Sequence, residues 1–257
     1  MMASMSLLLR PDDVLTVRPV LRYRRVSPNG NFRLHRAGSI VLGFVIAACL
    51  LGIQSTWAAQ LVKVQGVVQV SRGGQVLSSF EGQRLQEGDV VDTSQDSETL
   101  IRFDDGARLV VRAESNISLN QLKLKGPVTN RQKTVKIVKG ALRYVSAKAT
   151  VRRKVAFITP TSTIGIRGTD IEILVAQEVV QDNNPGTYLK VNTGIAQITA
   201  PDGAAEVVNP GEVAYGGEPE LQARGGGPKR ASARKVVVQA DGLGRAFRAS
   251  SLDALLK

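Results

Sequence analysis

Few side chains in this sequence could perform metal or nucleophilic chemistry. The only histidine is His35 and the only cysteine is Cys49, and both precede every strand-like segment. The rest of the chain therefore offers no thiolate or imidazole metal ligand, no Ser-His-Asp or Cys-His nucleophile and no disulfide. Carboxylates could still act as acid and base, and Asp104, Asp105 and Asp170 are the candidates. We expect the first two in a turn and the third in a bend, so we predict no enzyme activity, no metal site and no cofactor.

The run TPTSTIGIRGTDIEI, residues 159–173, at first resembles a phosphate-binding loop. Such a loop needs a lysine followed by serine or threonine after its second glycine, and a helix beginning there. Here a further β-forming run follows instead. The alternating apolar positions change parity between Ile166 and Ile171, which requires a bulge or tight bend. We predict a structural motif in which glycines allow the bend, a proline ends the preceding strand, and an arginine bonds to Asp170. Its residues are Pro160, Gly165, Arg167, Gly168 and Thr169.

A basic segment lies in the middle of the chain, whose net charge is +12. No acidic residue occurs between Glu114 and Asp170, so the segment predicts a positive surface that attracts an acidic protein face, an anionic envelope polymer or an anionic lipid surface. The candidate residues are Lys133, Lys136, Lys139, Arg143, Arg152, Arg153 and Lys154. The alternative is a set of solvated positions on ordinary strands. Nucleic acid is not an expected partner, because no aromatic residues are interleaved with the basic ones.

Valine and isoleucine alternate with polar residues from Leu61 to Tyr215, which predicts an all-β domain of about ten to twelve short strands. The clearest hairpin joins residues 100–103 to 108–111. Its connection contains Asp105-Gly106, a pair that favours a tight primed turn.

Strand-glycine-strand units recur in the sequence, around Gly66 and Gly194 and more weakly around Gly140. A second glycine element follows the first two units, at residues 85–90 and 208–213. Recurring units of this kind suggest strands that bury each other's faces in coils or layers. We therefore predict a β-helix-like fold or a layered β-sandwich.

An uncharged apolar run at residues 37–53 predicts one hydrophobic leader helix after a basic N-terminal region, residues 1–36. If residues 37–58 are a signal peptide, cleavage after Ala58 makes the protein periplasmic or otherwise exported. The run could instead remain as an inner-membrane anchor with the arginines on the cytoplasmic side. A lipoprotein box ending at Cys49 is a third alternative, although the residues that follow it stay apolar.

Glycine pairs and triplets at 216–217 and 225–227 predict a linker. Residues 59–216 would then be the β domain, and residues 217–257 a flexible basic tail that docks weakly at most. Within this tail, residues 235–238 could add an edge strand and residues 251–256 could form one or two helical turns.

The stretch 159–173 resembles the threonine-proline…valine-arginine-glycine-threonine signature of the FecR domain family, named for the ferric citrate uptake regulator. The resemblance extends over about residues 61–215 and includes Phe103-Asp104-Asp105-Gly106 and Val138-Lys139-Gly140. It implies an exported all-β domain, often β-helix-like, that senses or binds partners outside the cytoplasmic membrane.

The sequence departs from the regulatory members of that family in three places. The residues before the apolar run are too few for the usual helical anti-sigma module, and those after Tyr215 do not suggest a receptor-like α/β subdomain. Ile171 stands where the family usually has an aromatic residue. These departures favour a stand-alone exported FecR-domain protein that binds an envelope protein or anionic polymer. The alternative is a membrane-anchored FecR-like signal-transduction regulator with a short cytoplasmic tail.

Overall fold

The computed structural model describes residues 57–124, 132–147, 154–179, 183–217, 232–236, 247 and 250–256. These residues form a 15-stranded sheet and one short 3-10 helix, which confirms the predicted all-β class. The strands are more numerous than expected, and three of them are long, with 14 residues each. The predicted leader lies outside the described residues. Within the described part of the chain, no helix has the length and hydropathy needed to cross a membrane.

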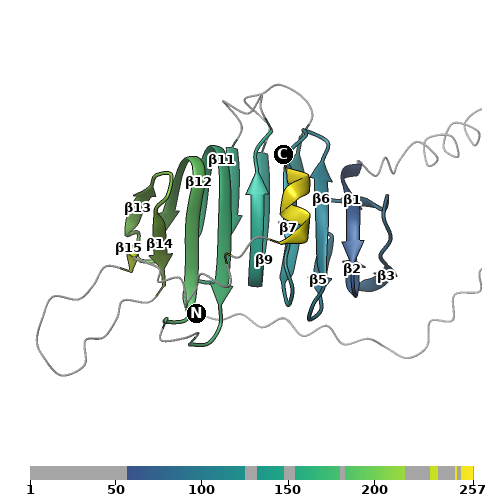
Figure 1. The fold of residues 1–257 in the computed structure, drawn as a ribbon, viewed down its shortest axis with the longest axis horizontal. Coiled ribbons are helices and arrows are strands. Elements are labelled where there is room, and N and C mark those ends of the chain that lie inside the picture. The colour runs from purple at the N-terminus through teal and green to yellow at the C-terminus, as the bar shows by residue number, and fades with distance from the viewer. Residues whose placement is uncertain are drawn as a thin grey trace, which may run out of the picture. The chain divides into compact units, whose positions relative to one another are not determined.

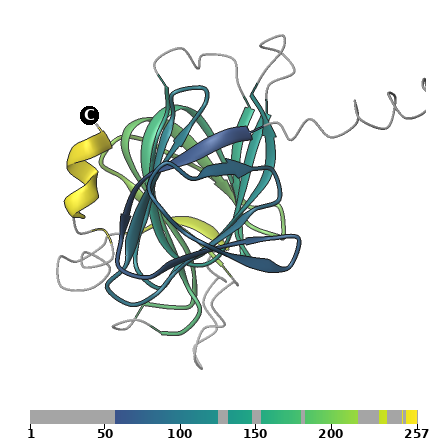
Figure 2. The same cartoon turned by 90° about the vertical axis from the view of Figure 1, so that its right-hand side faces the viewer.

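One mixed sheet folds over on itself into two layers, as the end-on view in Figure 2 shows. Three long strands cross between the layers and belong to both (Figure 1). They are β9 (Gln132–Val145), β11 (Thr163–Ala176) and β12 (Gly186–Thr199). The layered arrangement that the repeats suggested is therefore produced by strands that bend.

The first layer combines the C-terminal halves of β9 and β11 and the N-terminal half of β12 with six shorter strands. These are β4 (Arg84–Gln86), β1 (Trp57–Gln65), β6 (Glu98–Phe103), β7 (Arg108–Val111), β14 (Val213–Gly216) and β15 (Ala233–Val236). The second layer combines the other halves of the long strands with six more, and β10 pairs with β9 in parallel. These are β3 (Gln75–Ser78), β2 (Val68–Arg72), β5 (Val90–Thr93), β8 (Asn116–Lys123), β10 (Lys154–Ile158) and β13 (Ala205–Val208).

A single large apolar core lies between the two layers. Alternate residues of each strand point into it, which is the period-2 pattern that the sequence shows. Tyr144 stands at its centre, with its ring edge-on to Phe103 at 6.4 Å and to Phe157 at 5.2 Å between centroids. The outer faces of both layers are left for polar side chains and for the C-terminal segment.

The chain turns from one layer to the other at glycines with positive φ, each set against a serine or threonine of a neighbouring segment. The pairs are Gly66 with Ser97, Gly140 with Ser115, and Gly194 with Thr169. At Gly140, φ is +93°, and a Cβ would lie 2.5 Å from the Ser115 Cα. The Ser115 hydroxyl in turn accepts the Ala141 N–H at 3.0 Å. Glycine is therefore required here both for its φ and for the close approach of the backbone. The recurring glycines of the sequence mark these corners.

The predicted change of register in β11 occurs where it was expected. Pairing with β12 shifts between Arg167 and Asp170 and again between Asp170 and Ile171. Gly168 has φ +59°, so it provides the left-handed residue that the bulge needs. Gly165 does not: its φ is not positive, and a Cβ there would meet no atom within 4 Å. The bend thus depends on one of the two predicted glycines.

The second glycine elements also recur as one structure. In residues 86–89, the Asp89 carboxylate accepts the Gln86 N–H at 2.9 Å, and the Gly88 N–H bonds to a strand carbonyl at 2.7 Å. In residues 209–212, the Glu212 carboxylate accepts the Asn209 N–H at 2.8 Å, and the Gly211 N–H bonds to a strand carbonyl at 2.8 Å. Both turns pin a connection to the neighbouring strand.

The hairpin between β6 and β7 is confirmed, but its turn differs from the one predicted. A primed turn needs positive φ at both central residues. Among residues 104–106 only Gly106 has it, at +86°, and its N–H bonds to the Phe103 carbonyl at 2.9 Å. The carboxylate of Asp105 is instead turned inward and buried.

The structure places two parts of the predicted tail on the domain. Ala233–Val236 forms β15 at the edge of the first layer, beside β14, close to the predicted edge strand. Ser251–Leu256 forms the 3-10 helix η3, which packs on β6 and β7. These residues are therefore part of the folded unit. At the other end, β1 begins at Trp57, so the predicted cleavage position after Ala58 falls inside a strand.

Candidate functional site

The candidate catalytic carboxylates are each held by a cation. Asp104 pairs with Arg84 at 3.3 Å, Asp105 with Lys133 at 3.0 Å, and Asp170 with Arg143 at 2.7 Å. Across the described residues, no group of histidine, cysteine and carboxylate side chains could hold a metal ion. Each of the three carboxylates is therefore engaged in an ion pair.

Lys133, one of the predicted surface cations, lies inside the core. Its side chain is 1% exposed, and its Nζ is 3.0 Å from Asp105 Oδ2 and 3.2 Å from the Tyr144 hydroxyl. The same ammonium group lies 3.9 Å from the centre of the Phe103 ring. Lys133 shares its strand parity with the buried Val135 and Ile137 of β9, so it points inward with them. It is not part of a binding surface.

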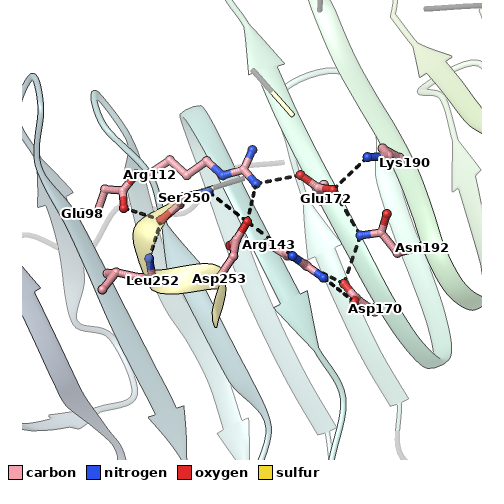
Figure 3. Close-up of polar contacts among 10 residues, drawn as sticks. All are labelled: Glu98, Arg112, Arg143, Asp170, Glu172, Lys190, Asn192, Ser250, Leu252 and Asp253. Carbon is pink, nitrogen blue, oxygen red and sulfur yellow. Dashed lines mark hydrogen bonds and ion pairs between the residues drawn. The ribbon is translucent and has the colours of Figure 1, made fainter. Parts of the chain in front are cut away.

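Arg143 faces outward from the first layer but is engaged in an ion-pair network (Figure 3). It binds both oxygens of Asp170, at 3.0 and 2.7 Å, and lies 3.3 Å from Asp253. The arginine that bonds to Asp170 is therefore Arg143 of β9, not the predicted Arg167, whose side chain is exposed. The ion pair of Asp170 therefore links two strands, β9 and β11, and does not bridge the bend as predicted.

The network continues on β11 and β12. Arg112, at the end of β7, donates to Glu172 at 2.7 Å and lies 3.4 Å from Asp253. Lys190 of β12 contacts Glu172 at 3.1 Å, and the Asn192 amide bonds to both Glu172 and Asp170. We call this set of residues, with Arg143, Asp170 and Asp253, the ion-pair network.

The network shifts the pKa values of Glu172 and Arg143 in the direction expected for ion pairing. Burial acts to raise the pKa of Glu172, but the charge of Arg112, hydrogen bonds from Asn192 and Arg112, and the charge of Lys190 together hold it below its ordinary value. The hydrogen bond to Asp170 raises the pKa of Arg143 despite partial burial. Both groups are therefore fixed in their charged forms at neutral pH.

The C-terminal segment covers part of this outer face. Leu252 and Leu256 are buried against Leu100 and Val110, and Phe247 packs with Tyr188 and Tyr215 farther along the layer. The sequence offered only a short helical turn here. Leu100 and Val110 are apolar residues at outward positions of strands whose other outward residues are mostly polar. That pattern could have predicted a segment covering them.

The outer face of the second layer is different, because four of its cations have no carboxylate partner among the described residues. Lys123, Lys136, Lys154 and Arg167 are all exposed, and within the described ranges none of them forms an ion pair. We call these four the basic face. Strand register places three of them close together. Lys123 of β8 and Lys154 of β10 both pair with Gln132 of β9, which lies between them. Lys154 and Arg167 are each next to a residue of the Val155–Ile166 pair, so they are also neighbours across β10 and β11.

Uncharged side chains surround these cations, including the exposed Ile158 beside Lys136 and Ile195 beside Arg167. One row across the layer reads Gln121, Thr134, Ala156, Gly165 and Gln197. Gly165 thus lies in an open part of a smooth sheet face. Of the other predicted surface residues, Lys139 is exposed beside the corner at Gly140, and Arg152 and Arg153 lie outside the described residues.

The loop before β11 explains the remaining motif residues. Pro160 lies two residues after the end of β10 at Ile158, as predicted for a residue that cannot donate to the ladder. Thr161 bonds to Thr187 at 2.8 Å and to the Gly216 carbonyl at 3.0 Å. Thr169 is buried at the corner opposite Gly194. The signature run therefore passes from the second layer to the first, and it contributes Arg167 to the basic face.

Comparison with known proteins identifies a family for part of the chain. Residues 89–197 match the family model described as FecR protein, which confirms the predicted resemblance over that segment. It contains the basic face and, apart from Asp253, the whole ion-pair network. No protein of curated function matches the sequence.

Two solved structures align with the chain, each described as "Crystal structure of a putative anti-sigma factor from Parabacteroides distasonis ATCC 8503". Their TM-scores are 0.41 and 0.42, with 12% and 11% sequence identity. In both cases the alignment covers 57% of this chain and 59% of the other.

Proposed function

We propose that this chain, whose residues 89–197 carry a FecR domain, is a non-enzymatic binding module of a signal-transduction regulator in the cell envelope. Its basic face would contact an anionic partner, either an acidic protein face or an anionic envelope polymer. The observation that carries the proposal is the exposure of Lys123, Lys136, Lys154 and Arg167 on one sheet face without carboxylate partners among the described residues.

Unpaired cations on a shared face create a positive potential that neighbouring carboxylates do not cancel. The neutral side chains between them let a partner approach the sheet closely. The contribution of one lysine near an anionic surface is about 1 kcal/mol, so three lysines would change affinity roughly a hundredfold. This charge does little for the fold, which makes recognition the better explanation for it.

The proposal places the domain outside the cytoplasmic membrane, either released after cleavage of residues 37–58 or held by residues 37–53. The apolar run and the arginines that precede it are compatible with both arrangements, and the departures from the regulatory members of the family favour the first. Sequencing the N-terminus of the mature protein separates the two. An N-terminus at Ala59 supports the exported form, whereas an intact leader supports the membrane-anchored regulator.

The binding test uses the full chain and a variant with Lys123→Gln, Lys136→Gln and Lys154→Gln. A matched control removes three solvent-accessible cations of the first layer, two of them paired with carboxylates, with Lys63→Gln, Arg84→Gln and Arg102→Gln. The two variants carry the same net charge. Each protein is eluted with salt from immobilised poly-glutamate and is used to capture partners from envelope extracts.

We expect the first variant to elute at lower salt and to lose the captured partner, because attraction at exposed charges is local and screened. The control variant should behave like the wild-type chain. If both variants lose binding equally, only net charge matters and the basic face is not a site. If neither does, the proposed function is wrong.

A further inference from the structure

The ion-pair network is incomplete without the C-terminal segment. The strands supply three of its cations, Arg112, Arg143 and Lys190, but only two of its carboxylates, Asp170 and Glu172. The third carboxylate is Asp253, from η3, which approaches both arginines (Figure 3). Among the described residues, the sheet side of the network therefore has three cations and two carboxylates, a net charge of +1 that Asp253 balances. The surface therefore needs one carboxylate from elsewhere.

An apolar contact lies beside this charge. Leu252 and Leu256 are 2% and 5% exposed and pack on Leu100 and Val110, with Val62 and Val145 at the margin. Leu255, between them in the sequence, points away and is 47% exposed. The surface thus contacts Leu252, the aspartate that follows it, and Leu256 three residues after that aspartate.

Residues 250–256 are bound to the sheet through side-chain contacts. Among the described residues its backbone makes no ladder bonds with the sheet. Its direct polar contacts to the strands run through side chains: Arg108 to the Leu255 carbonyl at 3.1 Å, Ser251 to Gln65 at 3.0 Å, and Ser250 to Glu98. The chain between β15 and Phe247 contains Gly242 and Gly244. Release of the segment would break no strand pairing.

The fit of Asp253 is also looser than that of the other carboxylates. Its two arginine contacts are 3.3 and 3.4 Å long, whereas Glu172 and Asp170 are each reached at 2.7 Å. One oxygen, Oδ1, is buried and has no hydrogen-bond partner in the described part of the chain. Arg112 and Arg143 remain oriented by Glu172 and Asp170 when Asp253 leaves, so the site stays formed.

We infer that the outer face of β6, β7 and β9 is a peptide-binding site for a short acidic segment of the type Leu-Asp-x-x-Leu, and that residues 250–256 fill it in cis. A partner peptide of the same chemistry competes with the chain's own segment for Arg112, Arg143 and the apolar contact. The basic face on the other layer is not involved, so the inference is independent of the proposed function.

The test keeps every residue of the protein and inserts a protease site between Gly242 and Leu243. Cleavage after folding leaves the C-terminal fragment bound only by its contacts. A labelled peptide of residues 247–257 is then titrated into cut and uncut protein, and binding is followed by fluorescence anisotropy. We expect saturable binding to the cut protein and at least tenfold weaker apparent binding to the uncut one, because the tethered segment is present at a high effective concentration.

Peptide variants identify the contacts. Leu252→Ala and Asp253→Asn peptides should bind at least tenfold more weakly than the natural sequence, whereas Leu255→Ala is a matched control that removes an exposed leucine and should bind normally. Absence of binding to the cut protein, or equal losses from Leu252→Ala and Leu255→Ala, would overturn the inference.

A second measurement covers the case in which cutting unfolds the domain. Hydrogen exchange of the uncut Asp253→Asn variant should show loss of protection in residues 250–256 alone, with β9 and β11 still protected. Loss of protection throughout the domain would mean that the segment is a structural part of the fold and not an exchangeable ligand.

Discussion

The two layers share three long strands, yet the cations on their outer faces differ in whether they are paired with carboxylates. On the first layer, Arg112, Arg143 and Lys190 are all paired with carboxylates and are partly or largely buried. On the second layer, the cations of the basic face are exposed and have no carboxylate partner among the described residues. The count of basic residues therefore says little about function until the partners of each are known.

The corner in β11 explains the difference. Before it, from Thr163 to Arg167, the strand carries no acid and lies in the second layer. After it, Asp170 and Glu172 face outward from the first layer and neutralise the arginines of the neighbouring strands. The acid-free stretch of the sequence ends at Asp170, where β11 enters the first layer. The bulge at Gly168 thus separates a charge-balanced surface from a positive one.

The largest effect that would test this contrast is expected from Arg112→Met. The substitution leaves Glu172, which is 3% exposed, without its shortest ion pair. Breaking a buried pair on one side costs about 3–5 kcal/mol, and we expect about 3 kcal/mol here because Lys190 and Asn192 still contact Glu172. Urea unfolding at neutral pH measures the loss.

A double variant distinguishes charge from packing. Arg112→Met with Glu172→Gln removes both charges and should be more stable than Arg112→Met alone. If the double variant is at least as destabilised as the single one, the cost does not come from an uncompensated carboxylate. Arg102→Met, at an exposed position of the same layer, should change stability by less than about 0.5 kcal/mol.

The sequence carried enough information to predict the fold class and the position of the bend. Both follow from local patterns: side chains alternate along a strand, and a parity change demands an extra residue. The recurring glycines also marked real corners, because the φ and close approach at Gly140 exclude other residues. These features are properties of a few neighbouring residues.

The sequence could not predict the pairing of charges. Strand alternation puts Lys133 and Lys136, three residues apart, on opposite faces of β9, but it does not identify Asp105 as the partner of the buried Lys133. Arg143 meets Asp170 only because β9 and β11 are neighbours in the first layer, and Asp253 reaches both arginines from the far end of the chain. Such contacts depend on strand order and register, which single-sequence patterns do not encode.

A smaller effect should appear in the pH dependence of stability. The pKa of Glu172 is lower in the folded protein than its ordinary value, so the folded state holds fewer protons on this group than the unfolded state. Its stabilising contribution is therefore complete above the unfolded pKa of about 4.3 and is lost as the pH falls through the lower, folded value. The difference in unfolding free energy between the wild type and Glu172→Gln should stay constant from pH 7 to about pH 5 and shrink below it. A constant difference down to pH 3 would show that the network does not depend on the charge of Glu172.

The smallest effect is expected on the basic face. Lys123, Lys136 and Lys154 contact no carboxylate of the described residues, so the triple substitution to glutamine should change the free energy of unfolding by at most about 0.5 kcal/mol. The triple variant could also be slightly more stable than the wild type, because neutralising neighbouring like charges relieves their repulsion. Urea unfolding at low and moderate salt measures the change, with Arg112→Met as the destabilised reference. If the triple variant were destabilised by 2 kcal/mol or more, these lysines would contribute to the fold as Arg112 does. The contrast between a surface that stabilises the domain and one that is free to bind a partner would then be lost.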